Sequence, residues 1–275
     1  MHLHGHSKAN LHYFEEDNGS FVIKYGSDRL NSQAVKQEIY RHRSIGSEFI
    51  VPKVIKKQKD CFVMPFYNGQ TILDLISSGN VRKIDSIIES LFNFIRYEFR
   101  NSTKCIVTDC HFKEKLNYLK IKLDKSYVSD IIDSLLEMKF QVNWYSGYCH
   151  GDFTLDNMLF DEKIVLLDFL DVYLESPVQD LVKLRQSFEF RWELLINVSN
   201  YDYKKISIGY DYINKIMSAE YASVASEYDL SSFILNLVYL VTLLRIVPYT
   251  SNTGIYECLM KEIRGVYGKV QELYT

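Results

Sequence analysis

Proline and extended hydrophobic runs are scarce in this sequence. Only 4 of the 275 residues are proline, and neither a repeat nor a low-complexity linker interrupts the chain. Charged residues make up 24% and hydrophobic residues 47% of the composition, which argues against wholesale disorder. A chain of this length can bury a large core, arranged as one large domain or as two lobes.

The sequence also lacks paired cysteines. It has five cysteines, an odd number, and none of them forms a Cys-x-x-Cys pair. A chain of this length does not need disulfides for stability, so reduced thiols and a cytosolic compartment are expected.

Neither a targeting segment nor a membrane span nor a basic surface is expected from this sequence. The polar, histidine-rich start does not resemble a signal peptide. The longest apolar stretch, Phe233–Val247, is shorter than the roughly 20 residues that span a bilayer, so it predicts a buried core helix. The formal net charge is −3, so we expect neither a nucleic-acid partner nor a membrane partner.

The pattern of the chain changes near Tyr67. Before it, Asn10–Phe14 and Ser20–Tyr25 flank a polar turn ending in Asn-Gly, which predicts a hairpin. Two further strands are predicted at Lys53–Lys57 and Cys61–Phe66, with a helix at Ser32–Ser44 between the pairs.

After Gly69 the chain is predicted to be mainly helical. In Val81–Arg100 the apolar residues recur at the spacing of one helix face. Short strands are predicted at Ser146–His150 and Lys163–Phe169. Further helices are predicted at Phe112–Leu123, Val128–Phe140, Val178–Phe190, Tyr203–Met217, Leu230–Val247 and Ile255–Leu273.

Between those two short runs lies the strongest chemical signal, His150-Gly151-Asp152-Phe153-Thr154-Leu155-Asp156-Asn157. A second acid, Asp168, follows an apolar strand. This order resembles a kinase catalytic loop and its metal-binding aspartate. Asp152 could accept the proton of an acceptor hydroxyl, while Asn157 and Asp168 offer the oxygen ligands that Mg²⁺ prefers. His150 is included as a catalytic candidate, although a structural role in the loop suits it better.

The His-Gly-Asp-x-x-x-x-Asn motif and the following hydrophobic-Asp-Phe strand resemble the aminoglycoside phosphotransferase and choline kinase group. The resemblance extends loosely from Asn10 to Phe190. It implies an α+β, bilobal, protein-kinase-like fold, with a small β-rich lobe at residues 1–67 and a larger helical lobe at 68–275. It also implies ATP and Mg²⁺ as cofactors, and phosphoryl transfer to a hydroxyl of a small molecule.

The N-terminal part can supply the nucleotide contacts that this resemblance implies. Lys24 ends an apolar run and is predicted to contact phosphates, with Glu38 as its helix partner; two solvated surface charges are the alternative. Gly5 and Ser7 could form a phosphate-covering turn, although the preceding segment is too short for a full first strand. The Asn18-Gly19 turn is the other candidate.

The segment that joins the lobes is predicted to hold the adenine. Met64, Pro65 and Tyr67 lie in an apolar stretch followed by a glycine. The Pro65 carbonyl can accept a hydrogen bond, and the N–H of Phe66 or Tyr67 is the expected donor. An ordinary core strand followed by a turn is the alternative.

The connection after Asp168 is short, since Pro177 and a helix follow soon after it. It leaves no room for the activation segment of a protein kinase. Asp180 resembles a family position that braces the catalytic loop. Candidate substrate contacts are Asp171, Tyr173, Glu189 and Trp192.

The acceptor and the activity itself stay open at this point. Acids beside aromatic rings suit an amine, but sugars also stack on such rings, so an amino alcohol, a sugar and an aminoglycoside-like compound are all possible. The abbreviated N-terminal part leaves one alternative from another class, a degenerate kinase fold that binds nucleotide or a partner without catalysis.

Overall fold

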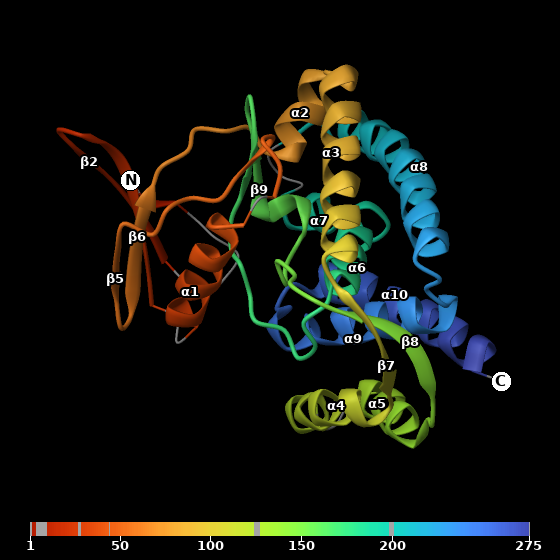
Figure 1. Ribbon diagram of the computed structural model, residues 1–275. Helices are drawn as coiled ribbons and strands as arrows, with labels where there is room; N and C mark the ends of the chain where they lie inside the picture. The colour runs from red at the N-terminus through yellow and green to blue at the C-terminus, as the bar shows by residue number, and fades with distance from the viewer. Residues whose placement is uncertain are drawn as a thin grey trace.

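The computed structural model describes residues 2–3, 10–26, 29–43, 45–123, 127–197 and 201–274. Strands and one helix gather at one side of the molecule, and helices make up the rest (Figure 1). The predicted α+β architecture with a small strand-rich part and a larger helical part is confirmed. The division at residue 67 stays a prediction.

The small part is built on a five-stranded antiparallel sheet with the order β1-β2-β3-β6-β5. Strands β2 and β3 form the predicted hairpin, paired from Asn10–Tyr25 to Glu16–Gly19, and β6 pairs with both β3 and β5. The strands are β1 His2–Leu3, β2 Asn10–Glu16, β3 Gly19–Tyr25, β5 Lys56–Gln58 and β6 Cys61–Pro65.

Helix α1 (Leu30–Arg41) packs against this sheet. Val22, Phe62 and Met64 of the sheet and Leu30 and Ala34 of the helix form a core of their own. Leu167, which directly precedes Asp168, packs against this small core. The segment that follows β10 and contains Asp168 therefore contacts the core beneath the small sheet.

The chain between the two parts docks closely on the large part. Gln70 exchanges backbone hydrogen bonds of 2.8–2.9 Å with Phe160. A side chain at Gly69 would approach Leu159 to 2.8 Å, so the close approach requires glycine there. Strand β4 (Phe49–Ile50) also pairs in parallel with β10 (Ile164–Leu166), which joins the N-terminal third of the chain to the strand before Asp168.

The large part consists of helices around one continuous core. In α3 the buried residues follow one face, including Ile84, Ile88, Leu91 and Ile95. Its neighbour α2 begins with a capping box between Thr71 and Asp74. The helices and short strands are α2 Ile72–Ser78, α3 Val81–Arg100, β9 Met158–Phe160, α6 Pro177–Phe188, α7 Trp192–Asn197, α8 Tyr203–Glu227, α9 Ser232–Leu244 and α10 Thr253–Tyr274.

A two-stranded ribbon carrying a helix pair projects from the large part (Figure 1). It consists of β7 (Thr103–Thr108), α4 (Cys110–Lys122), α5 (Tyr127–Glu137) and β8 (Gln141–Ser146). β7 and β8 are antiparallel. The prediction of a strand at Ser146–His150 is wrong, because β8 ends at Ser146 and the next residues form the entry to the catalytic loop.

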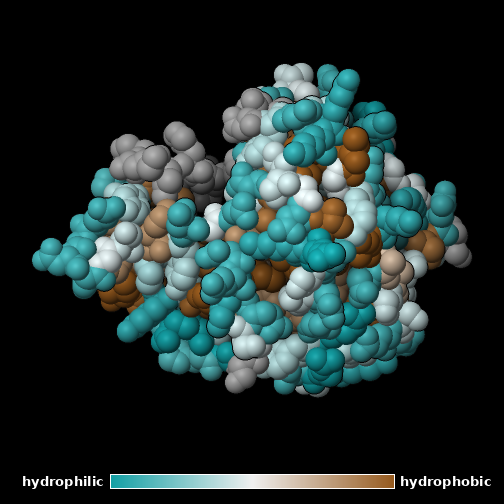
Figure 2. All heavy atoms as spheres, turned by 90° about the horizontal axis from the view of Figure 1, so that it is seen from above, coloured by the Kyte–Doolittle hydropathy of each residue, from teal (hydrophilic) through white to brown (hydrophobic). Residues whose placement is uncertain are grey.

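Helix α9 is the apolar stretch that the sequence assigns to the core. Twelve of its thirteen residues are buried, and only the first, Ser232, is exposed. Among the residues that the structure describes, the window Ser232–Tyr249 is the one long and apolar enough to cross a membrane, and 72% of it is buried inside the protein. Core helices of soluble proteins pass the same length and composition test, so this window is weak support for a membrane span. The surface seen from above is mostly hydrophilic, with scattered apolar residues (Figure 2).

A buried ion pair joins the end of α1 to α3. Both guanidinium nitrogens of Arg43 donate to the Glu98 carboxylate at 2.9 Å, and Arg43 also stacks on Tyr148 at 4.4 Å. Burial raises the pKa of Glu98 to about 7 even though Arg43 acts in the opposite direction. The pair therefore depends on both partners being present.

Replacing Arg43 by methionine should lower the free energy of unfolding by about 3–5 kcal/mol, because it leaves the buried Glu98 carboxylate without a partner. Urea denaturation measures the change. Arg41→Met, which breaks a partly exposed pair with Glu38, is the matched control and should have a much smaller effect. Equal losses for the two variants would contradict the assignment.

Candidate active site

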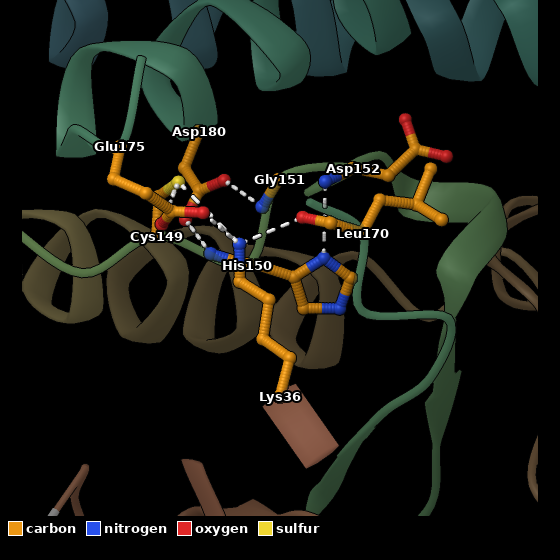
Figure 3. A network of polar contacts seen from close by, with 8 residues as sticks. All are labelled: Lys36, Cys149, His150, Gly151, Asp152, Leu170, Glu175 and Asp180. Atoms are coloured by element: carbon orange, nitrogen blue, oxygen red, sulfur yellow. Dashed lines mark hydrogen bonds and ion pairs between the residues drawn. The ribbon is translucent and has the colours of Figure 1, made fainter. Parts of the chain in front are cut away.

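The backbone of the predicted catalytic loop is held by one carboxylate from α6. Asp180 accepts hydrogen bonds from the N–H groups of His150 (2.6 Å) and Gly151 (2.8 Å), as Figure 3 shows. Asp180 is completely buried. Burial raises its pKa to about 8, and the two N–H donors act against this rise. Asp180 thus lies where the sequence analysis placed a bracing residue.

Gly151 allows the loop to turn tightly against the segment that follows Asp168. Its φ is +88°, and a side chain there would lie 2.0 Å from the carbonyl oxygen of Leu170. The Leu170 N–H in turn donates to the His150 carbonyl at 3.0 Å. The catalytic loop and residues 168–171 are therefore fixed side by side.

His150 is completely buried, and its ring packs in a tilted arrangement on Phe169, with 4.2 Å between the ring centroids. Its Nδ1 accepts the Asp152 N–H at 3.2 Å. Burial lowers the pKa of His150 to about 4, so the ring is neutral near pH 7. This environment suits a structural residue of the loop better than a proton carrier.

Asp152 points away from the network that holds the loop (Figure 3). One carboxylate oxygen pairs with Lys183 Nζ at 2.8 Å, and the other accepts from Asn157 Nδ2 at 2.9 Å. Burial pushes the pKa of Asp152 up, but the Lys183 charge and hydrogen bond outweigh it, and the pKa lies below its ordinary value. Asp152 is therefore ionised at neutral pH, as a general base must be.

The structure brings Asn157 and Asp168 together through the β9–β10 hairpin. Met158 pairs with Leu166 at the end of the hairpin, and the Leu167 N–H donates to the Asn157 carbonyl at 2.9 Å. Asp168 adopts a φ of +59°, a left-handed conformation that costs energy in a residue other than glycine. Such strain is typical of functional positions.

Lys24 forms an ion pair with Asp168 across the two parts of the molecule. The lysine is 1% exposed, whereas the Asp168 side chain is 31% exposed. A buried ammonium group needs an anion beside it, and Asp168 supplies that anion here. The resemblance to small-molecule kinases implies that a nucleotide phosphate and its metal ion would bind beside this pair.

The predicted pairing of Lys24 with Glu38 is wrong. Glu38 binds Arg41 in a bidentate manner and accepts the Val54 N–H at 2.7 Å. The reason is the helix period, since Gln33, Lys36 and Gln37 occupy the buried face of α1 and Glu38 lies outside it.

In place of an acid, α1 directs Lys36 toward the catalytic loop. Its Nζ donates at 2.7 Å both to the Leu170 carbonyl and to the Glu175 carboxylate, and lies 4.0 Å from Cys149 Sγ, as Figure 3 shows. Sequence reasoning missed this lysine because nothing in the α1 segment separates it from a surface lysine.

Lys183, the partner of Asp152, was also missed. It lies one helical turn after Asp180 on α6, and its side chain is 9% exposed. That spacing was a usable signal, because residues three apart share a helix face and Asp180 was already placed against the loop.

The predicted adenine segment contains the end of β6. Met64 is buried in the small core, and Pro65 pairs with Phe21. The Phe66 N–H donates to the Ser20 carbonyl at 2.9 Å, so it is already used and the suggestion of Phe66 as adenine donor is wrong. Tyr67, whose pKa is raised by burial, remains the candidate. Gly5 and Ser7 lie outside the described residues.

The four candidate substrate residues separate into two groups. Asp171 and Tyr173 line one cavity near the catalytic loop. Glu189 instead pairs with Arg185 at the end of α6, and Trp192 stacks on Phe190. Glu189 and Trp192 are thus engaged in contacts with other residues and do not line that cavity.

The oxygen donors fit a magnesium ion held jointly with phosphate. Across the described ranges, His, Cys, Asp and Glu side chains form no group of three or more that could hold a metal. Mg²⁺ commonly uses one or two carboxylates and completes its shell with substrate phosphates and water. The Asp168 carboxylate and the Asn157 amide oxygen match this smaller demand.

Comparison with known proteins agrees with this geometry. Residues 110–199 match the model of the phosphotransferase enzyme family, a segment that contains Asp152, Asn157, Asp168 and Asp180. A search of curated proteins found no significant match. The resemblance inferred from the motifs is thus confirmed over the part of the chain that carries them.

Solved structures with the same fold cover nearly the whole chain. A thermostable mutant of aminoglycoside phosphotransferase APH(4)-Ia has 12% identity and a TM-score of 0.58, covering 100% of this chain and 93% of that one. The streptomycin–ATP complex of APH(2")-IIa has 15% identity and a TM-score of 0.52, covering 100% and 92%. Choline kinase from Cryptosporidium parvum Iowa II has 11% identity and a TM-score of 0.56, covering 99% and 89%. These neighbours establish the protein-kinase-like fold, and they are small-molecule kinases, the enzyme class that the sequence predicted.

Gly151→Ala should destabilise the protein more than Gly79→Ala. Both positions have positive φ, but a side chain at Gly79 meets nothing within 4 Å. The control should lose about 1–2 kcal/mol of unfolding free energy, and Gly151→Ala roughly 1–3 kcal/mol more from the collision with Leu170. Equal losses in thermal or urea denaturation would show that the loop does not require this close contact.

Proposed function

We propose that this protein is an ATP- and Mg²⁺-dependent phosphotransferase that phosphorylates a hydroxyl group of a small molecule. The observation that carries the proposal is the convergence of Asp152, Asn157, Asp168 and Lys24, which come from three separate elements, beside a loop held by Asp180. The acceptor is an amino alcohol, a sugar or an aminoglycoside-like compound.

The roles follow from the contacts of each side chain. Asp152, ionised and held by Asn157 and Lys183, orients the acceptor hydroxyl and takes its proton. Asn157 and Asp168 would hold Mg²⁺, which neutralises phosphate charge when bound. Lys24 would exchange its ion pair with Asp168 for nucleotide phosphate. Catalysis is then mainly positioning and electrostatic stabilisation.

The use of ATP is supported by the ATP complex of the structural neighbour APH(2")-IIa. It is also supported by Lys24, which strand β3 of the small sheet directs toward Asp168. Met64, Pro65 and Tyr67 would form the adenine slot. A cytosolic location and the absence of nucleic-acid and membrane partners remain predictions that accompany the proposal.

One observation favours the alternative of a nucleotide-binding module without catalysis. In the structure Lys24 has no helix acid at its side, because Glu38 faces Arg41. The ionised, well-positioned Asp152 argues against this alternative, since a binding module has no need of a general base.

Asp152→Asn should lower ATP turnover with the cognate acceptor by about 10²–10⁴-fold, the usual contribution of a general base, while leaving Mg²⁺-dependent nucleotide binding intact. Calorimetry of nucleotide binding with and without Mg²⁺, and ADP release across amino alcohols, sugars and aminoglycosides, measure both. Unchanged turnover would refute the role of Asp152. Metal-dependent binding with no turnover of any acceptor would favour the binding module.

Lys183→Met should move the acid limb of the pH–kcat/KM profile to higher pH. Lys183 lowers the pKa of Asp152, so without it burial acts unopposed and the carboxylate is protonated at a higher pH. Activity then falls earlier as the pH decreases. Lys183→Arg keeps the charge and should largely restore the profile; a methionine variant whose limb does not move would contradict the coupling.

A further inference from the structure

A small cavity beside the catalytic loop has an unusual lining. Its volume is about 200 Å³. It lies among the start of α1, the middle of α4, the segment after Asp168 and the end of α9. The lining residues are Arg29, Ser32, Gln33, Lys115, Leu170, Asp171, Tyr173 and Arg245.

Positive charge dominates this cavity. Arg29, Lys115 and Arg245 contribute three cations, against one carboxylate from the exposed Asp171. Within the described residues, neither Lys115 nor Arg245 forms an ion pair with an acid. Lys115 and Arg245 by themselves therefore outnumber the single carboxylate in the lining of the cavity.

Two buried polar atoms in the lining have no hydrogen-bond partner. They are Arg245 Nη1 and Gln33 Oε1. The Gln33 side chain belongs to a residue that is only 6% exposed, and unsatisfied groups of this kind cost free energy unless a ligand or water meets them. Arg245 Nη1 is thus a free donor that an anionic group can use, and Gln33 Oε1 is a free acceptor for a hydroxyl or N–H group of the same ligand.

Burial and neighbouring positive charges both disfavour the charged form of Lys115. Its pKa is lowered to about 8, first by burial and then by the positive charges of Arg245, Arg29 and Lys122. A bound anion would relieve this repulsion.

The cavity adjoins the reacting groups. Leu170 lines it and also donates its N–H to the His150 carbonyl. Arg245 is close enough to contribute to the low pKa of Asp152. A ligand held by Arg245 would therefore lie within reach of the proposed base.

We propose that this cavity binds an anionic group of the acceptor, a carboxylate or a phosphate, so that the substrate is a small hydroxy compound carrying negative charge. This inference rests on the phosphotransferase function proposed above, and of the acceptor classes named there it is compatible only with a sugar derivative that carries a carboxylate or a phosphate. A polycationic or amine acceptor would meet repulsion from Arg29, Lys115 and Arg245.

The nucleotide is a less suitable occupant. The cavity shares no lining residue with Lys24 or with the adenine candidates Met64, Pro65 and Tyr67. Two of its cations come from α4 and the end of α9, which belong to the large helical part. Its volume is also below the roughly 300–1,000 Å³ of sites for drug-sized ligands, which suits a compact acceptor.

The test compares ligands of one carbon skeleton that differ in charge. Glycerate and glycerol 3-phosphate carry a carboxylate and a phosphate, glycerol is neutral, and 3-amino-1,2-propanediol is cationic. Binding of each to the full chain is measured by calorimetry or ligand-detected NMR, with Mg²⁺ and a non-hydrolysable ATP analogue saturating the nucleotide site. Inorganic phosphate is titrated in the same way.

Both anionic ligands, or the better of the two, should bind at least about ten-fold more tightly than glycerol and the amine, as expected for charge-assisted hydrogen bonds. The better ligand identifies whether carboxylate or phosphate is preferred. Arg245→Gln and Lys115→Gln should each remove most of this preference, while Lys120→Gln on the exposed side of α4 should keep it. Nucleotide affinity should be unchanged in all three.

Three results would overturn the inference. They are equal binding across the four ligands, tighter binding of the amine, and an anion preference that survives both substitutions. If the substitutions instead weaken nucleotide binding, the cavity holds nucleotide phosphate and the inference also fails. Mg²⁺-dependent nucleotide binding and the effect of Asp152→Asn on turnover are measured separately, so the phosphotransferase proposal can stand when this inference fails.

Discussion

The site depends on the way one buried carboxylate holds the catalytic loop. Asp180 accepts hydrogen bonds from two backbone N–H groups of the loop, and because it lies in the first turn of the buried helix α6, the loop is fixed relative to the large core. The left-handed turn at Gly151 then presses the loop against Leu170. In the proposed function, Asp152 can orient the acceptor because its own backbone is held in this way. Pre-organisation of this kind is what phosphoryl transfer requires of a protein.

Two buried lysines contact the catalytic loop and the segment beside it, one from the large part and one from the small part. Lys183, from the same helix as Asp180, keeps Asp152 ionised in spite of burial. Lys36, from α1, ties the small part to Leu170 and Glu175. The position of α1 therefore affects the segment that contains Asp168. Lys24 links the small sheet to the same segment through its ion pair with Asp168. Ion pairs therefore join the small part to the segment beside the catalytic loop, in addition to apolar packing.

The charges around Asp152 also bear on the acceptor. The structural neighbours include kinases whose names specify aminoglycosides and choline, yet the cavity beside this loop carries three cations. In the proposed function the fold positions a base and a metal site, while side chains on α4 and at the end of α9 select the acceptor. A shared fold is therefore compatible with acceptors of opposite charge.

The sequence alone predicted the candidate catalytic loop, the candidate metal ligands Asn157 and Asp168, the position of Asp180 and the order of most helices, because these depend on short spacings within one element or one turn. It did not determine the partners of Lys24, Lys36 and Lys183, nor the strand β4, because those contacts join residues far apart in the chain. Glu38 does not pair with Lys24 because it lies outside the buried face of α1. Phe66 cannot donate to adenine because its N–H already donates to the Ser20 carbonyl. Only the tertiary structure shows the cation-lined cavity, since its charges come from three helical segments that lie far apart in the sequence.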